Sequence, residues 1–144
     1  MKAFLGLALS LFVSASFACT DFTGTYKDQE SETYSVEQSG CTSLILNNNE
    51  GTFTTLADGQ FRISSEDQQA RVLTAVLFSG KDLIMDHHLE LKVALPAEIP
   101  VEIIPARIYA IYSKLSNGNI AITTTVYNIN GQVLGVESSQ HQKL

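Results

Sequence analysis

Turn-forming dipeptides recur along the chain between segments rich in β-branched and aromatic residues, and this punctuation constrains the fold most strongly. Asp-Gly and Asn-Gly pairs tolerate the positive φ angles of tight hairpins. Such pairs stand at 58–59, 117–118 and 130–131, and Ser79-Gly80 and the Asn-rich run 47–51 have the same character. In residues 19–144, no stretch of about 11 residues has apolar residues at the spacing of a helix. The sequence therefore predicts antiparallel strands joined as a meander.

Alternation between the turns predicts about ten strands. They are expected at 23–27, 33–38, 42–46, 52–57, 60–64, 69–78, 82–94, 106–115, 119–128 and 132–141. A twisted sheet of this many strands tends to close or to split, and closure removes the exposed edges that invite aggregation. We therefore predict an all-β fold, a single antiparallel meander barrel of about 8–10 strands, with a two-sheet β-sandwich as the alternative.

Residues 1–18 have the three-part pattern of a secretory signal peptide: Lys2, an apolar run, and small residues before Cys19. The apolar run is shorter than the roughly 20 residues that span a bilayer, and no later stretch qualifies as a membrane helix. We expect cleavage before Cys19 and a soluble protein exported to the periplasm or secreted. A lipoprotein modified at Cys19 is the less favoured alternative, because Ser16 and Phe17 depart from the residues that usually precede a lipidated cysteine.

Cys19 and Cys41 are the only cysteines, so one intramolecular bridge is possible. Export to an oxidising compartment predicts that it forms, and closing this loop should contribute about 3 kcal/mol. No Cys-x-x-Cys motif or clustered ligand set favours a redox or metal role instead. The mature chain, 19–144, is therefore expected to be one domain with a disulfide near its N-terminus.

The mature chain is acidic: Lys2 leaves with the leader, so eight basic residues face fifteen acidic ones. This sign disfavours nucleic acid and anionic membrane surfaces as partners. The sequence has no nucleophile motif, no His-Glu-x-x-His and no phosphate-binding glycine loop. We therefore expect a non-enzymatic protein without a cofactor.

Alternation is clearest from Asp82 to Leu95, where one face is apolar except for His87. His88 points to the opposite face, so the two histidines cannot chelate one metal ion within a regular strand. Asp86, His88 and Glu90 share the polar face and could supply metal ligands or a carboxylate-oriented imidazole. A solvated polar face is the preferred interpretation, because no second ligand cluster completes a site.

Two residues are candidates for the polar end of a ligand pocket, His87 and Arg107. In a barrel that holds a ligand, a histidine on the apolar face and a cation on the 106–115 strand could anchor the ligand's polar group. In a filled barrel, which we favour, His87 is neutral and hydrogen-bonded within the core. Arg107 is then solvated if Ala110 and Tyr112 face inward.

All three prolines lie in the segment 96–105, which favours an extended connector over a central strand. Its apolar residues need cover, so we expect the segment to lie across the barrel.

The stretch Phe22-Thr-Gly-Thr-Tyr26 places an aromatic residue two positions after a glycine in the first strand, and it resembles the Gly-x-Trp start of lipocalins and related calycin barrels. The closing hairpin, Ile120 to Leu144 around Asn130-Gly131, is similar to the end of small lipid-binding barrels. The resemblance implies a cup-shaped barrel that holds a small apolar molecule, with a lid at 96–105.

Two functions are therefore expected. The first is binding of a small apolar or amphipathic ligand inside the barrel, by a protein that we expect to be a monomer. The second is binding of another macromolecule through the outer surface, as inhibitors and accessory proteins do. A ligand binder needs a cavity with a few polar anchors, whereas a protein-binding module can have a filled core and an exposed apolar patch.

Overall fold

The computed structural model describes residues 18–144, and these form an all-β structure, as predicted. The predicted signal peptide, residues 1–18, lies outside the described residues except for Ala18. Each predicted strand overlaps an observed one. The elements are β1 (Gly24–Lys27), β2 (Thr33–Ser39), β3 (Ser43–Asn48), β4 (Gly51–Leu56), β5 (Arg62–Glu66), β6 (Ala70–Ser79), β7 (Asp82–Leu91), the 3-10 helix η1 (Val101–Ile103), β8 (Pro105–Lys114), β9 (Ile120–Asn128) and β10 (Val133–Lys143).

The ten strands form one antiparallel sheet in the order β4-β3-β2-β1-β10-β9-β8-β7-β6-β5. Consecutive strands pair as hairpins except β4 and β5, and the first strand pairs with the last. In that pairing Tyr26 lies opposite Lys143 and Lys27 opposite Gln142. The sheet is therefore a single meander rather than two separate sheets, and β4 and β5 are its edges.

The two edges approach each other at one end of the molecule. Asp58, between β4 and β5, forms a bridge with Leu77 of β6, and the Gly59 amide donates to the Val76 carbonyl at 2.9 Å. Gly59 has a φ of +73°, a conformation that side-chain-bearing residues rarely adopt. The curved sheet is thus drawn together at this end, while β4 and β5 do not pair with each other.

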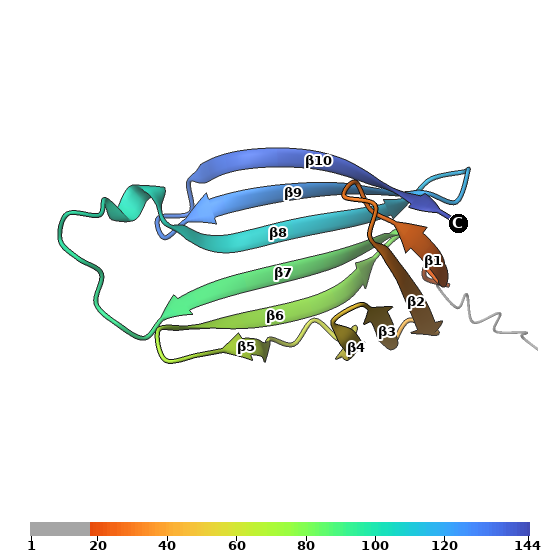
Figure 1. Ribbon diagram of the computed structural model, residues 1–144, viewed down its shortest axis with the longest axis horizontal. Helices are drawn as coiled ribbons and strands as arrows, with labels where there is room; N and C mark the ends of the chain where they lie inside the picture. Colours follow the sequence, from red (N-terminus) through yellow and green to blue (C-terminus); the bar gives the residue numbers. More distant parts are fainter. Residues whose placement is uncertain (1–17) are drawn as a thin grey trace, which may run out of the picture.

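Figure 1 shows a long layer made of β6–β10, with the shorter strands β1–β4 lying across one end of it. The strands β1–β4 contain four to seven residues, and β6–β10 contain nine to eleven. The long layer therefore extends past the short strands, and its far end carries η1 and the connector between β7 and β8 (Figure 1).

The hydrophobic core lies between the two layers at the end where the edges approach. Alternation directs one face of each strand into this space. The hydroxyl of Tyr26, a fully buried side chain, donates to the Phe22 carbonyl at 2.8 Å, which satisfies both polar groups. The buried core consists of Phe22, Tyr26, Val36, Leu44, Val76, Leu83, Ile120 and Ile122.

The segment before β1 is fixed to the β2–β3 hairpin. Cys19 and Cys41 form the predicted disulfide, with their Cα atoms 5.6 Å apart. The Gln38 side chain accepts from the Phe22 amide at 2.9 Å and donates to the Thr20 carbonyl at 3.0 Å. These contacts hold Phe22 in the core although it precedes the first strand.

The connector between β7 and β8 does not lie across the barrel, so that prediction was wrong. It extends beyond the far end of the long layer (Figure 1), and Ile99, Val101 and Ile103 are 41%, 44% and 64% exposed. A hydrogen bond attaches the connector to β9: the buried Asn128 side chain donates to the Glu102 carbonyl at 2.8 Å. The short strands β1–β4 end before this region (Figure 1), so within residues 18–144 no second layer lies there for the connector to cover. Among residues 18–144, no helix is both long and apolar enough to cross a membrane.

Candidate ligand pocket

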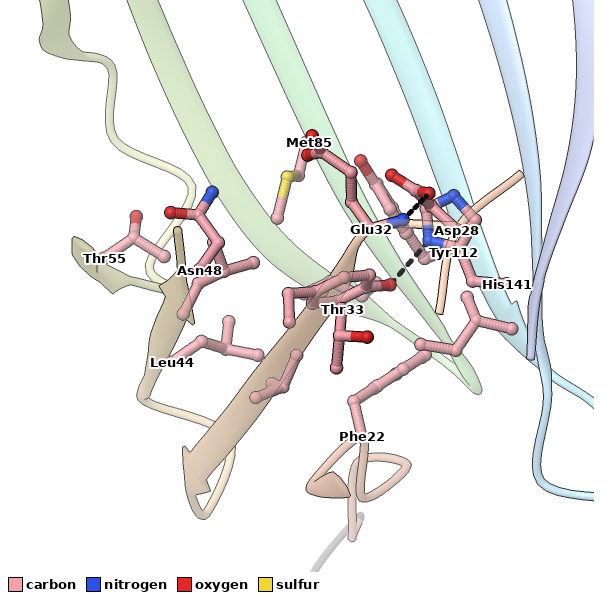
Figure 2. Close-up of a pocket in the computed structure, with 15 residues that line it drawn as sticks. Phe22, Asp28, Glu32, Thr33, Leu44, Asn48, Thr55, Met85, Tyr112 and His141 are labelled. Atoms are coloured by element: carbon pink, nitrogen blue, oxygen red, sulfur yellow. Dashed lines mark hydrogen bonds between the residues drawn. The ribbon is translucent and has the colours of Figure 1, made fainter. Parts of the chain in front are cut away.

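A pocket of about 280 Å³ opens between the two layers, next to the core. Figure 2 shows Phe22 at one end of it and Asp28, Glu32 and His141 at the other. The inner walls are apolar and come from both layers: Phe22, Val36, Leu44, Leu46, Leu83, Met85 and Ile120. The lining also contains Thr33, Asn48 and Thr55, and the end formed by Asp28, Glu32 and His141 is called the mouth here (Figure 2).

The walls of the pocket follow from period-two alternation and strand register. Tyr34 and Val36 of β2 face inward, and Val36 lies opposite Leu46 of β3. From the long layer, Leu83 of β7 lies opposite Tyr112 of β8, and both line the pocket. Because paired residues of neighbouring antiparallel strands share a face, each such pair adds to one continuous wall.

A hydrogen-bonded aromatic pair stands at the mouth. The Tyr34 hydroxyl lies 2.6 Å from His141 Nδ1, and the two rings meet edge to face with centroids 5.5 Å apart. The Tyr34 ring also stacks on Tyr26 at 5.6 Å. Burial raises the pKa of Tyr34 well above its usual value, and burial lowers the pKa of His141. Both groups therefore favour their neutral forms and offer hydrogen bonds rather than fixed charge.

The hairpin between β1 and β2 contributes acidic groups to the mouth. Asp28 Oδ1 accepts hydrogen bonds from the amides of Glu30 and Glu32 at 2.9 and 2.8 Å. This arrangement fixes the tight turn, in which Ser31 has a φ of +71°. Asp28 and Glu32 both line the pocket, and among residues 18–144 no lysine or arginine lines it.

His87, one of the two sequence candidates, lies on the inner face of β7 but does not line this pocket. Its Nδ1 is 2.8 Å from the Thr74 hydroxyl, which is 2.7 Å from the Ser64 hydroxyl. Burial lowers the pKa of His87. His87 is therefore bonded within the sheet, through the Thr74 hydroxyl, and is not an anchor of this pocket.

Arg107, the other candidate, lies on the outer face. The register places it opposite His88, whereas His87 lies opposite Ile108. Its guanidinium makes two 2.8 Å hydrogen bonds to Asp86 and lies 5.0 and 5.4 Å from the ring centroids of two tyrosines, Tyr109 and Tyr127. The structure therefore corrects the prediction that His87 and Arg107 form the polar end of one pocket, because the sheet separates them.

The polar face of β7 is occupied by ion pairs. Asp86 binds Arg107, and Glu90 lies 2.5 Å from Nε of Arg71 on β6. His88 Nε2 is 3.3 Å from Asp86 Oδ1 but makes no hydrogen bond. Within residues 18–144, no three His, Cys, Asp or Glu side chains are grouped so as to hold a metal ion.

Sequence reasoning missed Tyr34, His141 and Asp28 as pocket residues. Alternation alone places Tyr34 on the same face as Val36, so part of the wall was accessible from the sequence. Tyr34 and His141, however, are separated by 107 positions. They meet only because β1 pairs with both β2 and β10, and no local pattern encodes that pairing.

The fold and this site define a small, partly closed antiparallel barrel with an apolar pocket beside its core. Comparisons with protein-family models, with curated proteins and with solved structures gave no match. An inference about function therefore starts from the pocket.

Proposed function

We propose that the protein is exported, to the periplasm or out of the cell, and binds a small apolar or amphipathic molecule in this pocket without catalysing a reaction. The pocket itself carries the proposal, because its inner walls are apolar and a few polar groups stand at its mouth. Ligand pockets are generally concave and mostly apolar, with volumes of roughly 300–1,000 Å³. A volume of about 280 Å³ suits a small molecule or one end of a longer one.

The inner face of the long layer continues beyond the mouth and offers room for such a longer ligand. Ile108 lies opposite His87 and Val126, so these residues share a face with Met85 of the pocket wall. Ile108 is 40% exposed, because β1–β4 do not reach this part of the layer. An apolar tail that extends out of the pocket would therefore still lie against apolar side chains.

Two further observations support export and binding. The Cys19–Cys41 disulfide suits an oxidising compartment, which the leader-like residues 1–18 also indicate. The lipocalin-like stretch Phe22–Tyr26 lies beside the pocket, and Phe22 is one of its lining residues. This resemblance implies a cup-shaped barrel that holds a small apolar molecule, which agrees with the proposal.

The proposal is tested by native mass spectrometry of the protein purified from its own host. We expect a mature chain that begins at Cys19 without lipid and carries a small co-purified molecule. Binding to the pocket is then measured with the fluorescent apolar probe N-phenyl-1-naphthylamine. Leu46→Trp fills the pocket and should weaken probe binding at least about tenfold, which corresponds to about 1.4 kcal/mol.

Ile45→Trp is the matched control, because Ile45 is the neighbouring residue on β3 and faces away from the pocket. It should bind the probe as the wild type does. Equal binding by the wild type and both variants, with unchanged circular dichroism, would contradict a ligand site in this pocket. A diacylated Cys19 would contradict the proposed maturation.

Binding of another macromolecule is the second candidate, and the exposed apolar residues at the far end favour it. Ile103 and Ile129 are 64% and 67% exposed, and Val133 of the adjoining hairpin is 56% exposed. Exposed apolar patches often mark interaction sites. Photo-crosslinking from position 129 in the host separates the candidates: a single identified partner whose crosslink is lost in Ile103→Ser but retained in Leu46→Trp would favour this second function.

A further inference from the structure

We propose that the pocket selects amphipathic ligands with a cationic head group, such as an alkyl ammonium, over carboxylates with the same tail. This inference rests on the proposed function and specifies the class of ligand. It follows from the distribution of charge and aromatic rings around the mouth.

In the part of the chain that the structure describes, the lysines and arginines all lie outside the pocket lining, and the carboxylates of Asp28 and Glu32 are part of it. Carboxylate ligands are usually held by arginine or lysine, which donate charge-assisted hydrogen bonds. A ligand carboxylate in this mouth would instead meet like charges.

The Asp28 carboxylate has a free position for a cation. Its Oδ1 accepts the amides of Glu30 and Glu32, which fixes the orientation of the group. Within residues 18–144, Oδ2 of Asp28 has no hydrogen-bond partner. A carboxylate that is held in place by the backbone with one oxygen free is suited to accept from an ammonium group.

The field of Asp28 reaches the neighbouring polar pair. Burial is the main cause that raises the pKa of Tyr34, and the negative charge of Asp28 raises it further. For His141, burial lowers the pKa and Asp28 opposes that effect. Asp28 thus favours positive over negative charge at Tyr34 and His141. His141 is the lining group that could be protonated to meet an anion, and its burial disfavours that form.

Aromatic rings add a second attraction for a cation. Tyr34 and Tyr112 both line the pocket, and the Tyr34 hydroxyl pairs with His141 at the mouth. The face of a phenol ring attracts ammonium groups, and the attraction increases where water is excluded. The apolar walls would hold the alkyl tail, while the carboxylates and the Tyr34 ring at the mouth would hold the head group.

The test compares ligands that differ only in the head group. Decyltrimethylammonium, decanol and decanoate are used below their micellar concentrations to displace N-phenyl-1-naphthylamine. The ammonium should displace the probe at a concentration at least about tenfold lower than decanoate. Raising the salt from about 20 mM to about 500 mM should reduce this preference, because salt screens the carboxylates.

Substitutions of single acidic residues test which carboxylates cause the preference for the ammonium ligand. Asp28→Asn keeps an oxygen that can accept the two hairpin amides but removes the charge, and Glu32→Gln removes the second charge. Each substitution should bring the concentrations at which decyltrimethylammonium and decanoate displace the probe closer together. Glu30→Gln is the matched control, because Glu30 belongs to the same hairpin but does not line the pocket. Circular dichroism and thermal unfolding establish that each variant is folded.

The outcomes separate this inference from the proposed function. If decanoate binds as well as the ammonium, or if Asp28→Asn and Glu32→Gln leave the ratio unchanged, the selectivity is overturned while the pocket remains a ligand site. If the probe and all three ligands fail to bind, the proposed function itself fails. Ammonium binding that persists in Leu46→Trp would show attachment to the acidic surface and would also overturn the inference.

Discussion

Two inward-facing histidines have the same local chemistry although they lie on different strands. His87 and His141 each place Nδ1 close to a hydroxyl, at 2.8 Å from Thr74 and 2.6 Å from Tyr34. Burial is the main cause that lowers the pKa of both imidazoles below the ordinary value of 6.5. The folded protein therefore binds fewer protons than the unfolded chain just below pH 6.5.

The consequence is a stability that falls on acidification. The contribution of the two histidines is fully present above the unfolded pKa of 6.5 and is lost as the pH falls through the lower folded values. His87→Gln and His141→Gln remain neutral and retain hydrogen-bonding groups. In denaturant unfolding between about pH 7.5 and 5.5, each variant should show a shallower decrease in unfolding free energy than the wild type. A double variant with the wild-type pH dependence would contradict this assignment.

At the scale of elements, the segment before β1 supplies a core side chain but is attached to the sheet by few contacts. Phe22 is 1% exposed and belongs to the core, yet it precedes the first strand. The Cys19–Cys41 disulfide and the Gln38 side chain connect this segment to the β2–β3 hairpin. The bridge closes a loop with a sequence separation of 22, which restricts the unfolded chain.

We therefore expect the double variant Cys19→Ser/Cys41→Ser to lose about 3 kcal/mol of unfolding free energy. Denaturant titration measures this loss, and the reduced wild type provides the comparison that keeps both sulfur atoms. The two should unfold at similar denaturant concentrations. A loss smaller than about 1 kcal/mol in both would mean that the Gln38 contacts and Phe22 burial hold the segment without the bridge.

At the scale of the molecule, the sheet combines a packed end and an open end. Val36, Leu44, Leu83 and Ile122 are buried where the two layers overlap. By contrast, every residue of the edge strand β5 is exposed, and the connector beyond β7 carries exposed isoleucines. Local opening requires little free energy where few apolar contacts are lost.

Native-state hydrogen exchange should follow this division. Peptides from β7, β8 and β9, which are paired on both sides, should exchange slowly. Peptides from β5 and from 96–104 should exchange at least about a hundredfold faster, because they open without unfolding the core. Equal protection of β5 would contradict its position as a free edge and would indicate that another chain pairs with it.

The sequence predicted the short-range features of this structure but not the long-range ones. The strand positions follow from alternation and from dipeptides such as Asp58-Gly59 and Asn130-Gly131, which are local signals. The all-β class, the meander and the Cys19–Cys41 bridge were predictable for that reason. The exposure of the 92–104 connector was not, because it depends on how far β1–β4 reach along the long layer.

The sequence by itself therefore determined the strands, their faces and the disulfide, since these depend on neighbouring residues or on a unique pair of cysteines. Parity placed His87 on an inner face, but whether Arg107 shares that face depends on cross-strand register. Which residues meet in the pocket depends on the tertiary structure. Tyr34, Asp28 and His141 meet because the first strand pairs with the last, and the free energy of that closure comes from the whole core rather than from any local segment.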